Sequence, residues 1–569
     1  MKKILRIDLQ KQTFTYEEPG PEYLHWGGRG LTAAIMTREV DPKTDPLGPN
    51  NKLIFATGLL AGTAIPNNGR LSVGTKSPLT HTIKEANAGG TAAIKMARLN
   101  IIAIIFEGVA SELINIKVDK DGVTFHPAAA YHLLGTNATY AKVQAEFGAG
   151  LSVIANGPAG EKQLLSSGIF VSSPEYFPRA AGRGGVGAVM GSKNVKAVII
   201  DDSGSRMEAA VDPAAMKAAA KEYAKILVAD PGTQGNKELG TGAVLTFINS
   251  IGALSTKNFS EGSWDKADKI SAESLVTLIK SRPNGEHIHR CMPGCVIQCS
   301  NVITDENGEI ITSGLEYETL ALVGSNCLID DLDVIARVNG ICNDYGLDTM
   351  DVGCAIAVAM ENGVIAWGDG PAAIKLVEDC IKDGSVSEMI GHGAAYTGKK
   401  LKAKRIPAVK GQSLAGYDPR GMKGTGVTYA TATMGADHTC GNVIPVMPGY
   451  DPLAPEGQGP ISGHVQNFFA GVDSFGLCLF AGLISIGSDE TRMLLTKAYV
   501  AQTGAEGLPE DYFMDIGTKT IDLEVAYNRR IGFTNEDDRL PDFFCKEVLE
   551  STGQVFDVSP AELDAVHNK

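Results

Sequence analysis

The sequence has few cysteines, few aromatic residues and no long apolar run. Only 10 of its 569 residues are cysteine, and aromatic residues make up 6%. The longest apolar stretches, such as IIAIIF at residues 101–106, are far too short to cross a bilayer. The amino terminus, MKKILRIDLQK, reaches Arg6 and Asp8 without an apolar core, so it does not resemble a secretory signal. We therefore expect a cytoplasmic protein that is not attached to a membrane.

Positive charge is also scarce. Lys and Arg number 51 against 66 Asp and Glu, which gives a formal net charge of −15 and argues against nucleic acid as a bulk partner. The sequence shows no repeat at solenoid spacing. Glycine, by contrast, is abundant, with 66 residues. We expect these glycines in turns and where backbone approaches a ligand closely.

Three regions of different character follow one another along the chain. Residues 1–205 contain strand-like segments, and ILRIDLQKQTFTYEE alternates in the manner of a hairpin. Residues 206–410 contain helical segments that begin after Asp, Ser or Thr and end at glycine. Residues 411–569 mix loops with helices, including one predicted across HVQNFFAGVDSFGLCLFAGLI. The pattern predicts an α+β fold of three domains, a β-rich amino-terminal domain and two mostly α-helical domains.

Three cysteines are concentrated in one short segment, CMPGCVIQC. Cys291, Cys295 and Cys299 lie beside Pro293 and Gly294, which suit a polar loop better than a packed core. In a reducing compartment, clustered thiols hold metal more often than they form disulfides. The spacing favours an iron–sulfur cluster, with a zinc site or three unliganded thiols as alternatives. A cluster needs a fourth ligand, and spacing alone does not choose among the other cysteines.

Local chemistry separates the remaining cysteines into two kinds. Cys342, Cys354 and Cys380 fall in apolar helical patterns and are interpreted as packing residues. Cys478 ends the segment DSFGLC, in which a glycine lets backbone come close to a bulky group. The segment NDYGLD, residues 343–348, has the same form. Two such turns in different regions indicate two related contacts around one central ligand.

With these motifs the sequence resembles the tungsten-containing aldehyde ferredoxin oxidoreductase family over essentially the whole chain. That family holds a tungsten bis-pterin beside a [4Fe–4S] cluster. Its cluster ligands are a Cys-x2-Cys-x3-Cys triplet and a distant cysteine that ends an Asp-x-x-Gly-Leu-Cys turn. The resemblance implies that Cys291, Cys295, Cys299 and Cys478 hold the cluster, and that the β-rich domain is the base that receives the bis-pterin.

The resemblance also implies a catalytic pair and a set of cofactor contacts. Glu318 resembles the family's substrate-side glutamate, a base, and His438 resembles the histidine that donates to the carbonyl oxygen. A Mg²⁺ ion joins the two pterin phosphates near an Arg-Ala-x-Gly-Arg stretch. The implied cofactor-binding residues are Arg70, Asn87, Gly89, Arg179, Ala180, Gly182, Arg183, Asn343, Leu347, Asp348, Asp473 and Leu477.

These residue types suit such a site on chemical grounds, although structural interpretations stay open beside the functional ones. One guanidinium can bond a cluster sulfur and a pterin or phosphate together, and glycine-rich backbone can approach phosphate. Asp348 could instead cap a helix, Glu318 could form a surface ion pair, and His438 could be a structural histidine. The AGRGGVG loop is not a dinucleotide-binding fingerprint, because an arginine interrupts its glycines. GGRGL, at residues 27–31, is interpreted as a turn.

Two positions depart from the family pattern. The cysteine triplet has one extra residue in its first gap, and the first turn opens with Asn343 in place of Asp. The resemblance implies oxidation of an aldehyde to a carboxylic acid, with electrons passing through the cluster to ferredoxin or an iron–sulfur partner subunit. We expect a homodimer or a hetero-oligomer. The alternatives are reduction of an activated aromatic acyl-CoA and a non-catalytic iron–sulfur electron-transfer subunit.

Overall fold

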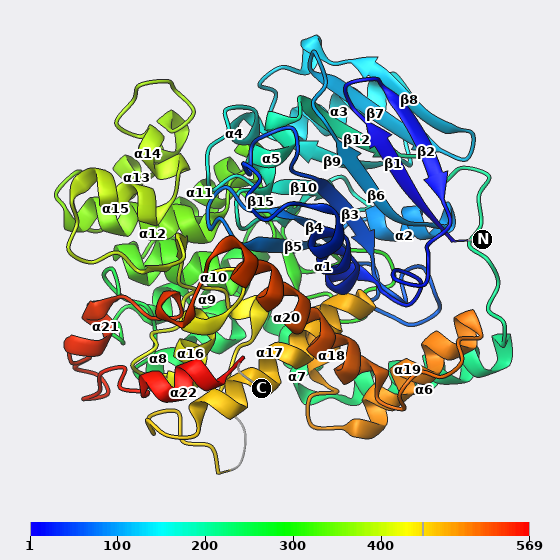
Figure 1. Ribbon diagram of the computed structural model, residues 1–569. Coiled ribbons are helices and arrows are strands. Elements are labelled where there is room, and N and C mark those ends of the chain that lie inside the picture. Colours follow the sequence, from blue (N-terminus) through cyan, green and yellow to red (C-terminus); the bar gives the residue numbers. More distant parts are fainter. Residues whose placement is uncertain (1, 446–448, 568–569) are drawn as a thin grey trace.

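Two six-stranded sheets make up most of the amino-terminal part of the protein (Figure 1). The computed structural model describes residues 2–445 and 449–567. The strands of the first sheet are β1 (Lys3–Asp8), β2 (Thr13–Glu17), β3 (Leu53–Thr57), β4 (Leu71–Lys76), β5 (Ile83–Ala88) and β6 (Ile101–Glu107). Those of the second sheet are β7 (Ile114–Asp119), β8 (Gly122–Pro127), β9 (Ser152–Asn156), β10 (Ile169–Ser172), β11 (Pro178–Ala181) and β12 (Val195–Ile200).

The two sheets are built on the same plan. Their strand orders are β2-β1-β6-β3-β4-β5 and β11-β10-β9-β12-β7-β8, and each contains a single parallel pair, β1 with β6 or β7 with β12. Phe55 and Ile104 of the first sheet share one buried core with Ile116 and Val198 of the second. Burial explains the continuous apolar runs of the central strands. The hairpin predicted at the amino terminus is present as β1 and β2.

Short helices cover the sheets and connect their strands. They are α1 (Gly28–Glu39), α2 (Ala92–Arg98), η1 (Ala129–Tyr131), α3 (Thr136–Phe147), α4 (Pro158–Glu161) and α5 (Val186–Ser192). The edge strands β5 and β11 contact each other. Residues predicted to bind the cofactor therefore meet where the two sheets adjoin, because Asn87 lies on β5 and Arg179 and Ala180 lie on β11.

The GGRGL segment is not a turn, and this prediction was wrong. It begins helix α1, whose amino-terminal glycines press against the carboxyl-terminal end of a distant helix. A Cβ on Gly28 would lie 2.0 Å from the carbonyl oxygen of Asp473. Arg29 is 1% exposed and donates from Nε and Nη2 to the two carboxylate oxygens of Glu524, each at 2.8 Å. Its ionic partner lies far along the sequence, so the local pattern gave no sign of a buried charge.

The rest of the chain is mostly helical. Its first helices are α6 (Pro213–Ala229), α7 (Pro231–Leu239), η2 (Thr241–Val244), α8 (Leu245–Ser250), η3 (Ala267–Ile270), α9 (Ala272–Lys280), α10 (Tyr317–Thr319), η4 (Leu320–Gly324), η5 (Ser325–Cys327), α11 (Leu332–Tyr345), α12 (Thr349–Glu361), α13 (Gly370–Asp379), α14 (Glu388–Gly391) and α15 (Ala394–Leu401). The later ones are α16 (Lys423–Thr431), η6 (His438–Cys440), α17 (Gln458–Phe475), α18 (Leu479–Leu483), α19 (Asp489–Thr503), α20 (Tyr512–Ile531), η7 (Asn535–Asp537), α21 (Asp542–Lys546) and α22 (Pro560–Ala565).

Two small sheets lie within this helical part, and the helical sequence pattern did not predict them. A three-stranded sheet consists of β13 (Glu286–His289), β14 (Ser300–Thr304) and β15 (Ile310–Ser313), and a two-stranded one of β16 (Ala408–Val409) and β17 (Gln412–Ser413). The mixed α+β class with a β-rich amino-terminal region is nonetheless confirmed. None of the helices in the described ranges has the length and apolar character needed to cross a membrane.

Packing crosses the predicted boundary at residue 410. Helix α6 lies beside α19 (Figure 1), and the N–H of Asp212 donates to the carbonyl of Ala501 at 2.9 Å. Leu414 and Val427 share one core with Ile335 of the preceding region. The division into residues 1–205, 206–410 and 411–569 stays a prediction.

Candidate cofactor and active site

The NDYGLD segment is the junction between α11 and α12. Gly346 ends α11 with φ +77°, and the N–H of Leu347 donates back into the last turn of that helix at 2.8 Å. Asp348 then caps α12, so the capping role expected from the sequence is present. A Cβ on Gly346 would lie 3.1 Å from the Cα of Gly157. The turn therefore rests on backbone that follows β9 of the second sheet.

The DSFGLC segment forms an equivalent junction between α17 and α18. Gly476 ends α17 with φ +75°, and the N–H of Leu477 donates into the last turn at 3.1 Å. Cys478 occupies the position before α18. A Cβ on Gly476 would lie 2.7 Å from the Cα of Gly58, so this turn rests on the first sheet. The single helix predicted across this segment was wrong, because the left-handed glycine ends it.

The structure brings the four predicted cluster cysteines together. Cys295 and Cys478 are buried in one core cluster, against which Cys291 and Cys299 pack. A hydrogen bond with Cys295 lowers the pKa of Cys291 to about 6. Burial, and then the charge of Cys291, raises the pKa of Cys478. The thiols of two remote segments therefore lie within electrostatic range of each other.

The other cysteines in apolar helices are separate from this group. Cys342, Cys354 and Cys380 are fully buried in the core of the helical region that includes α11 and α12, as the sequence indicated. Within the ranges that the structure describes, no three His, Cys, Asp or Glu side chains are grouped so as to hold a single metal ion.

Arg70 lies between the cysteines and strand β5. Its Nη2 donates to the carbonyl of Asn87 at 3.0 Å, and its Nε bonds the Asn87 side chain. Its backbone N–H donates to the carbonyl of Gly476 at 3.2 Å. A Cβ on Gly89 would lie 3.4 Å from Cys291 Sγ and 3.5 Å from Arg70 Nη1. The guanidinium thus lies beside Cys291, a predicted cluster ligand, and beside Asn87 and Gly89, which are predicted cofactor contacts.

The Arg-Ala-Ala-Gly-Arg stretch, residues 179–183, has open space beside Gly182 and an unpartnered hydrogen-bond donor on Arg179. Arg179 donates to the Oγ of Ser300 at 2.9 Å and of Ser313 at 3.0 Å, while its buried Nε bonds no other described residue. A Cβ on Gly182 would meet nothing closer than Ala180 at 3.6 Å and Asp348 Oδ1 at 3.8 Å. An accessible backbone next to a free guanidinium N–H fits an anionic group such as phosphate.

Arg183 is buried among three carboxylates. Its guanidinium lies 3.2 Å from Asp348, 3.7 Å from Asp351 and 3.7 Å from Asp437. Burial by itself would lower the pKa of Arg183, but these carboxylates raise it overall. Burial would raise the pKa of Asp437, yet Lys84 and Arg183 hold it well below its usual range. The arrangement places a network of ion pairs against the turn at residues 343–348.

Glu318 and His438 face each other, although they come from α10 and η6. Glu318 Oε1 lies 3.3 Å from His438 Nε2, without the alignment of a hydrogen bond, and the N–H of Gly416 donates to Oε2 at 2.6 Å. No described hydrogen-bond partner meets His438 Nδ1 or Glu318 Oε1, and both atoms are buried. Burial raises the pKa of Glu318, against the opposing charge of His438. The ring of Tyr417 lies 5.9 Å from that of His438.

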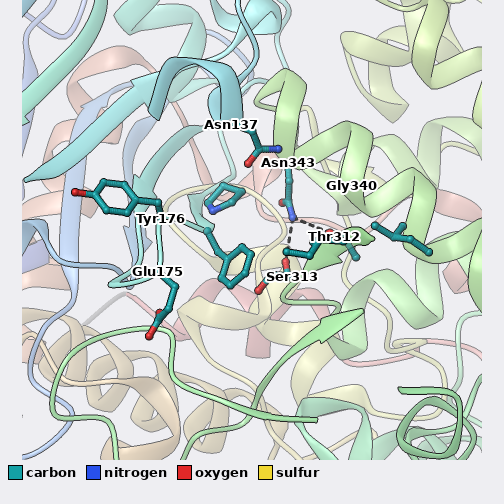
Figure 2. A pocket seen from close by; sticks show the side chains of 11 residues that line it. Asn137, Glu175, Tyr176, Thr312, Ser313, Gly340 and Asn343 are labelled. Atoms are coloured by element: carbon teal, nitrogen blue, oxygen red, sulfur yellow. Dashed lines mark hydrogen bonds between the residues drawn. The ribbon is translucent and has the colours of Figure 1, made fainter. Parts of the chain in front are cut away.

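Asn343 lies apart from this pair, on a cavity of about 310 Å³ (Figure 2). Its Nδ2 donates to Thr312 Oγ1 at 3.2 Å and to the Ser313 carbonyl at 3.1 Å, shown as dashed lines in Figure 2. Glu175 and Tyr176 lie on another side of the cavity. Neither Glu318 nor His438 lines it. The residue that departs from the family pattern is thus tied to β15 through its amide.

Sequence reasoning missed Arg29 and Glu85, charged residues that surround Asp473, which is one of the predicted cofactor contacts. Asp473, at the end of α17, lies 3.5 Å from Arg29 Nη1, and burial followed by the charge of Glu85 raises its pKa. Asp437, 3.7 Å from the Arg183 guanidinium, was not predicted as a site residue either. A lone Asp or Arg in a sequence gives no signal of burial. Only the closely spaced glycines of GGRGL, residues 27–31, could have indicated that Arg29 lies in a tightly packed segment.

Comparisons with known proteins agree with one another. The family model for the "Aldehyde ferredoxin oxidoreductase, N-terminal domain" matches residues 4–202. The family model for "Aldehyde ferredoxin oxidoreductase, domains 2 & 3" matches residues 218–567. Tungsten-containing aldehyde ferredoxin oxidoreductases of Pyrococcus furiosus and Thermococcus kodakarensis are 32% and 33% identical, each over 96% of this chain and 92% of the relative. The chain therefore belongs to the aldehyde ferredoxin oxidoreductase family and is an oxidoreductase.

More distant similarities exist as well. The WOR-like subunit of an aliphatic sulfonate oxidoreductase of Pyrococcus furiosus is 25% identical over 78% of this chain and 75% of its own. Among solved structures, the BamBC active-site complex of benzoyl coenzyme A reductase with 1,5-dienoyl-CoA matches with a TM-score of 0.79. That match covers 100% of this chain and 97% of the other at 19% identity, which shows a shared fold.

Proposed function

We propose that this chain oxidises an aldehyde to a carboxylic acid at a tungsten bis-pterin. A [4Fe–4S] cluster held by the four cysteines would supply one-electron transfer to ferredoxin or an iron–sulfur partner subunit. The observation that carries the proposal is the convergence of Cys478 with Cys291, Cys295 and Cys299 beside Arg70. The half-buried pair of Glu318 and His438 supplies the groups that aldehyde oxidation requires.

The residues present fit the proposed cofactors. Four thiolates are the ligand set of a cubane cluster. The unpartnered Nε of Arg179 and the open backbone at Gly182 suit the pterin phosphates. Asn87 and Gly89 would contribute to the same binding, and a Mg²⁺ ion would offset the phosphate charge. The two Gly-Leu turns, Asn343–Asp348 and Asp473–Cys478, would hold the two pterins. When bound, the tungsten centre supplies the two-electron redox chemistry.

The chain's own residues move the protons and bind the substrate. Oxidation of an aldehyde by water yields the acid, two protons and two electrons, so a base must accept a proton. Glu318 is suited to this because burial brings its pKa toward the working pH. His438 donates to the carbonyl oxygen, on which negative charge develops. The aromatic neighbours Tyr317 and Tyr417, with rings 4.8 Å apart, are buried beside the pair.

Replacing Glu318 tests this assignment. We expect Glu318→Gln to lower kcat about a hundredfold or more, because the amide cannot accept the proton, while tungsten and iron stay bound. In the unsubstituted enzyme, activity should fall as the pH is lowered through the raised pKa of Glu318, and this acid limb should vanish in the variant. Glu306→Gln, in an exposed turn, is the matched control. Unchanged turnover in Glu318→Gln would remove Glu318 from the mechanism.

Reduction of an aromatic acyl-CoA is the second candidate. The fold shared with the benzoyl coenzyme A reductase complex favours it, whereas the greater identity to aldehyde ferredoxin oxidoreductases favours aldehyde oxidation. Anaerobic assays with oxidised viologen and aldehydes, and with reduced viologen and acyl thioesters, separate the two. A carrier without catalysis would contain iron but neither tungsten nor pterin.

A further inference from the structure

Asn67 lies between the two segments that carry the proposed cluster ligands, and all its polar groups bond to them. Its backbone N–H donates to the carbonyl of Gly294 at 3.3 Å, and its carbonyl accepts from the N–H of Cys478 at 2.8 Å. Its Oδ1 accepts from the N–H of Val296 at 3.0 Å, and its Nδ2 donates to Cys295 Sγ at 3.3 Å. One residue from the amino-terminal region thus ties together both sources of thiols.

The orientation of the Asn67 amide follows from its partners. A backbone N–H can only donate, so the N–H of Val296 requires the oxygen of the amide. The NH₂ group then faces Cys295, whose sulfur accepts. Asn67 is 1% exposed, so the hydrogen bond to sulfur is shielded from water. In such surroundings a hydrogen bond is stronger than at the surface.

Cys291 and Cys295 have different neighbours around the set of four predicted cluster cysteines. Cys291 lies next to Gly89 and Arg70, on the side of the proposed pterin. Cys295 follows Gly294, which is exposed and takes φ +72° with no atom within 4 Å of an added Cβ. Arg70 and Asn67 therefore lie beside different cysteines of the segment.

We propose that Asn67 is a positioning residue that holds the segments of Cys295 and Cys478 in place relative to each other. Through its hydrogen bond to Cys295, Asn67 also raises the reduction potential of the cluster. This rests on the proposed function, in that the four thiolates hold a [4Fe–4S] cluster. A cluster that takes up one electron becomes more negative, and a donor to its sulfur stabilises that state.

Two substitutions separate the donor from the backbone contacts. Asn67 has φ +59°, which glycine adopts readily, so Asn67→Gly removes only the amide. Asn67→Asp keeps an acceptor for Val296 and replaces the donor with a negative charge. Asn68→Ala is the control, because the Asn68 amide donates within its own loop, to Thr63 Oγ1 at 2.9 Å.

Iron content and an EPR-monitored redox titration of the anaerobically purified proteins provide the readouts. We expect Asn67→Gly to lower the equilibrium constant for one-electron reduction about tenfold, which is about 59 mV toward negative potential. Asn67→Asp should shift the midpoint further in the same direction, and Asn68→Ala should leave it unchanged.

The outcomes distinguish this inference from the proposed function. Full iron content with an unchanged midpoint in Asn67→Gly would overturn the inference, as would equal shifts or equal iron loss in Asn68→Ala. Loss of iron from both Asn67 variants but not from Asn68→Ala would support the positioning role. Absence of iron–sulfur signals from the unsubstituted protein would refute the cluster itself.

Discussion

The two Gly-Leu turns have nearly the same backbone but different chemistry at their ends. Each follows a helix that ends at a left-handed glycine, Gly346 or Gly476, and each precedes another helix. Each glycine packs on a glycine of the amino-terminal region, Gly157 near the second sheet or Gly58 near the first. The first turn ends in a carboxylate and the second in a thiol.

The difference shows how one local structure serves two tasks. Asp348 caps α12 and lies 3.2 Å from Arg183, so its turn presents a hydrogen-bonding carboxyl group. Cys478 is aimed at the other thiols, and its N–H is bonded to Asn67. The backbone supplies a rigid approach in both cases, and the last side chain is a hydrogen-bonding carboxylate in one turn and the proposed cluster ligand in the other.

Exchanging the terminal thiol should have the largest effect. We expect Cys478→Ser to lose or degrade the cluster, because a serine hydroxyl is a poor replacement for one of four thiolate ligands. Cys342→Ser, at the carboxyl-terminal end of α11 before the first turn, should keep full iron content, since Cys342 is packed in an apolar core. Iron analysis and visible absorption after anaerobic purification measure both. Equal iron content in the two variants would refute the assignment of Cys478.

Replacing Gly346 or Gly476 by alanine should have an intermediate effect on stability and iron content. An alanine at positive φ costs about 1 to 2 kcal/mol, and the Cβ would lie closer to backbone at Gly476, 2.7 Å, than at Gly346, 3.1 Å. We expect Gly476→Ala to lower the apparent Tm more than Gly346→Ala and to reduce iron content. Thermal unfolding under anaerobic conditions and iron analysis give the comparison. Iron loss confined to Gly346→Ala would contradict the division of roles between the turns.

Neutralising the terminal carboxylate should have the smallest effect. Asn caps helices as well as Asp does, and Arg183 keeps Asp351 and Asp437 as partners. We expect Asp348→Asn to leave iron content and Tm nearly unchanged and to lower tungsten occupancy modestly. Asp369→Asn is the matched control, because Asp369 caps α13 by accepting from the N–H of Ala372. Equal tungsten content in both variants would leave Asp348 with its capping role alone.

Much of the fold could be predicted because its determinants are local. Strands of the two sheets and most helices follow from apolar periodicity and from caps such as Asp331 and Asp348. The packing cysteines were identified in the same way. The small sheet β13–β15 was missed, because its short strands lie in a region whose neighbours are helical.

The candidate site was predictable only in part. The resemblance to a family supplied Glu318 and His438, and the structure places them 3.3 Å apart. Asn67 and Arg29 were not identified, because their partners lie 228 and 495 residues away in the sequence. No local pattern carries information about such pairings.

The sequence by itself determined the two Gly-Leu turns, because they depend on the φ preference of glycine. It also determined the helix caps, which depend on short polar side chains near helix ends, and the number and spacing of the cysteines. Only the tertiary structure decided which thiols meet, which charges are buried together and which amide faces a sulfur. Those outcomes depend on distances between remote segments, and only the packing of the sheets against the helices fixes such distances.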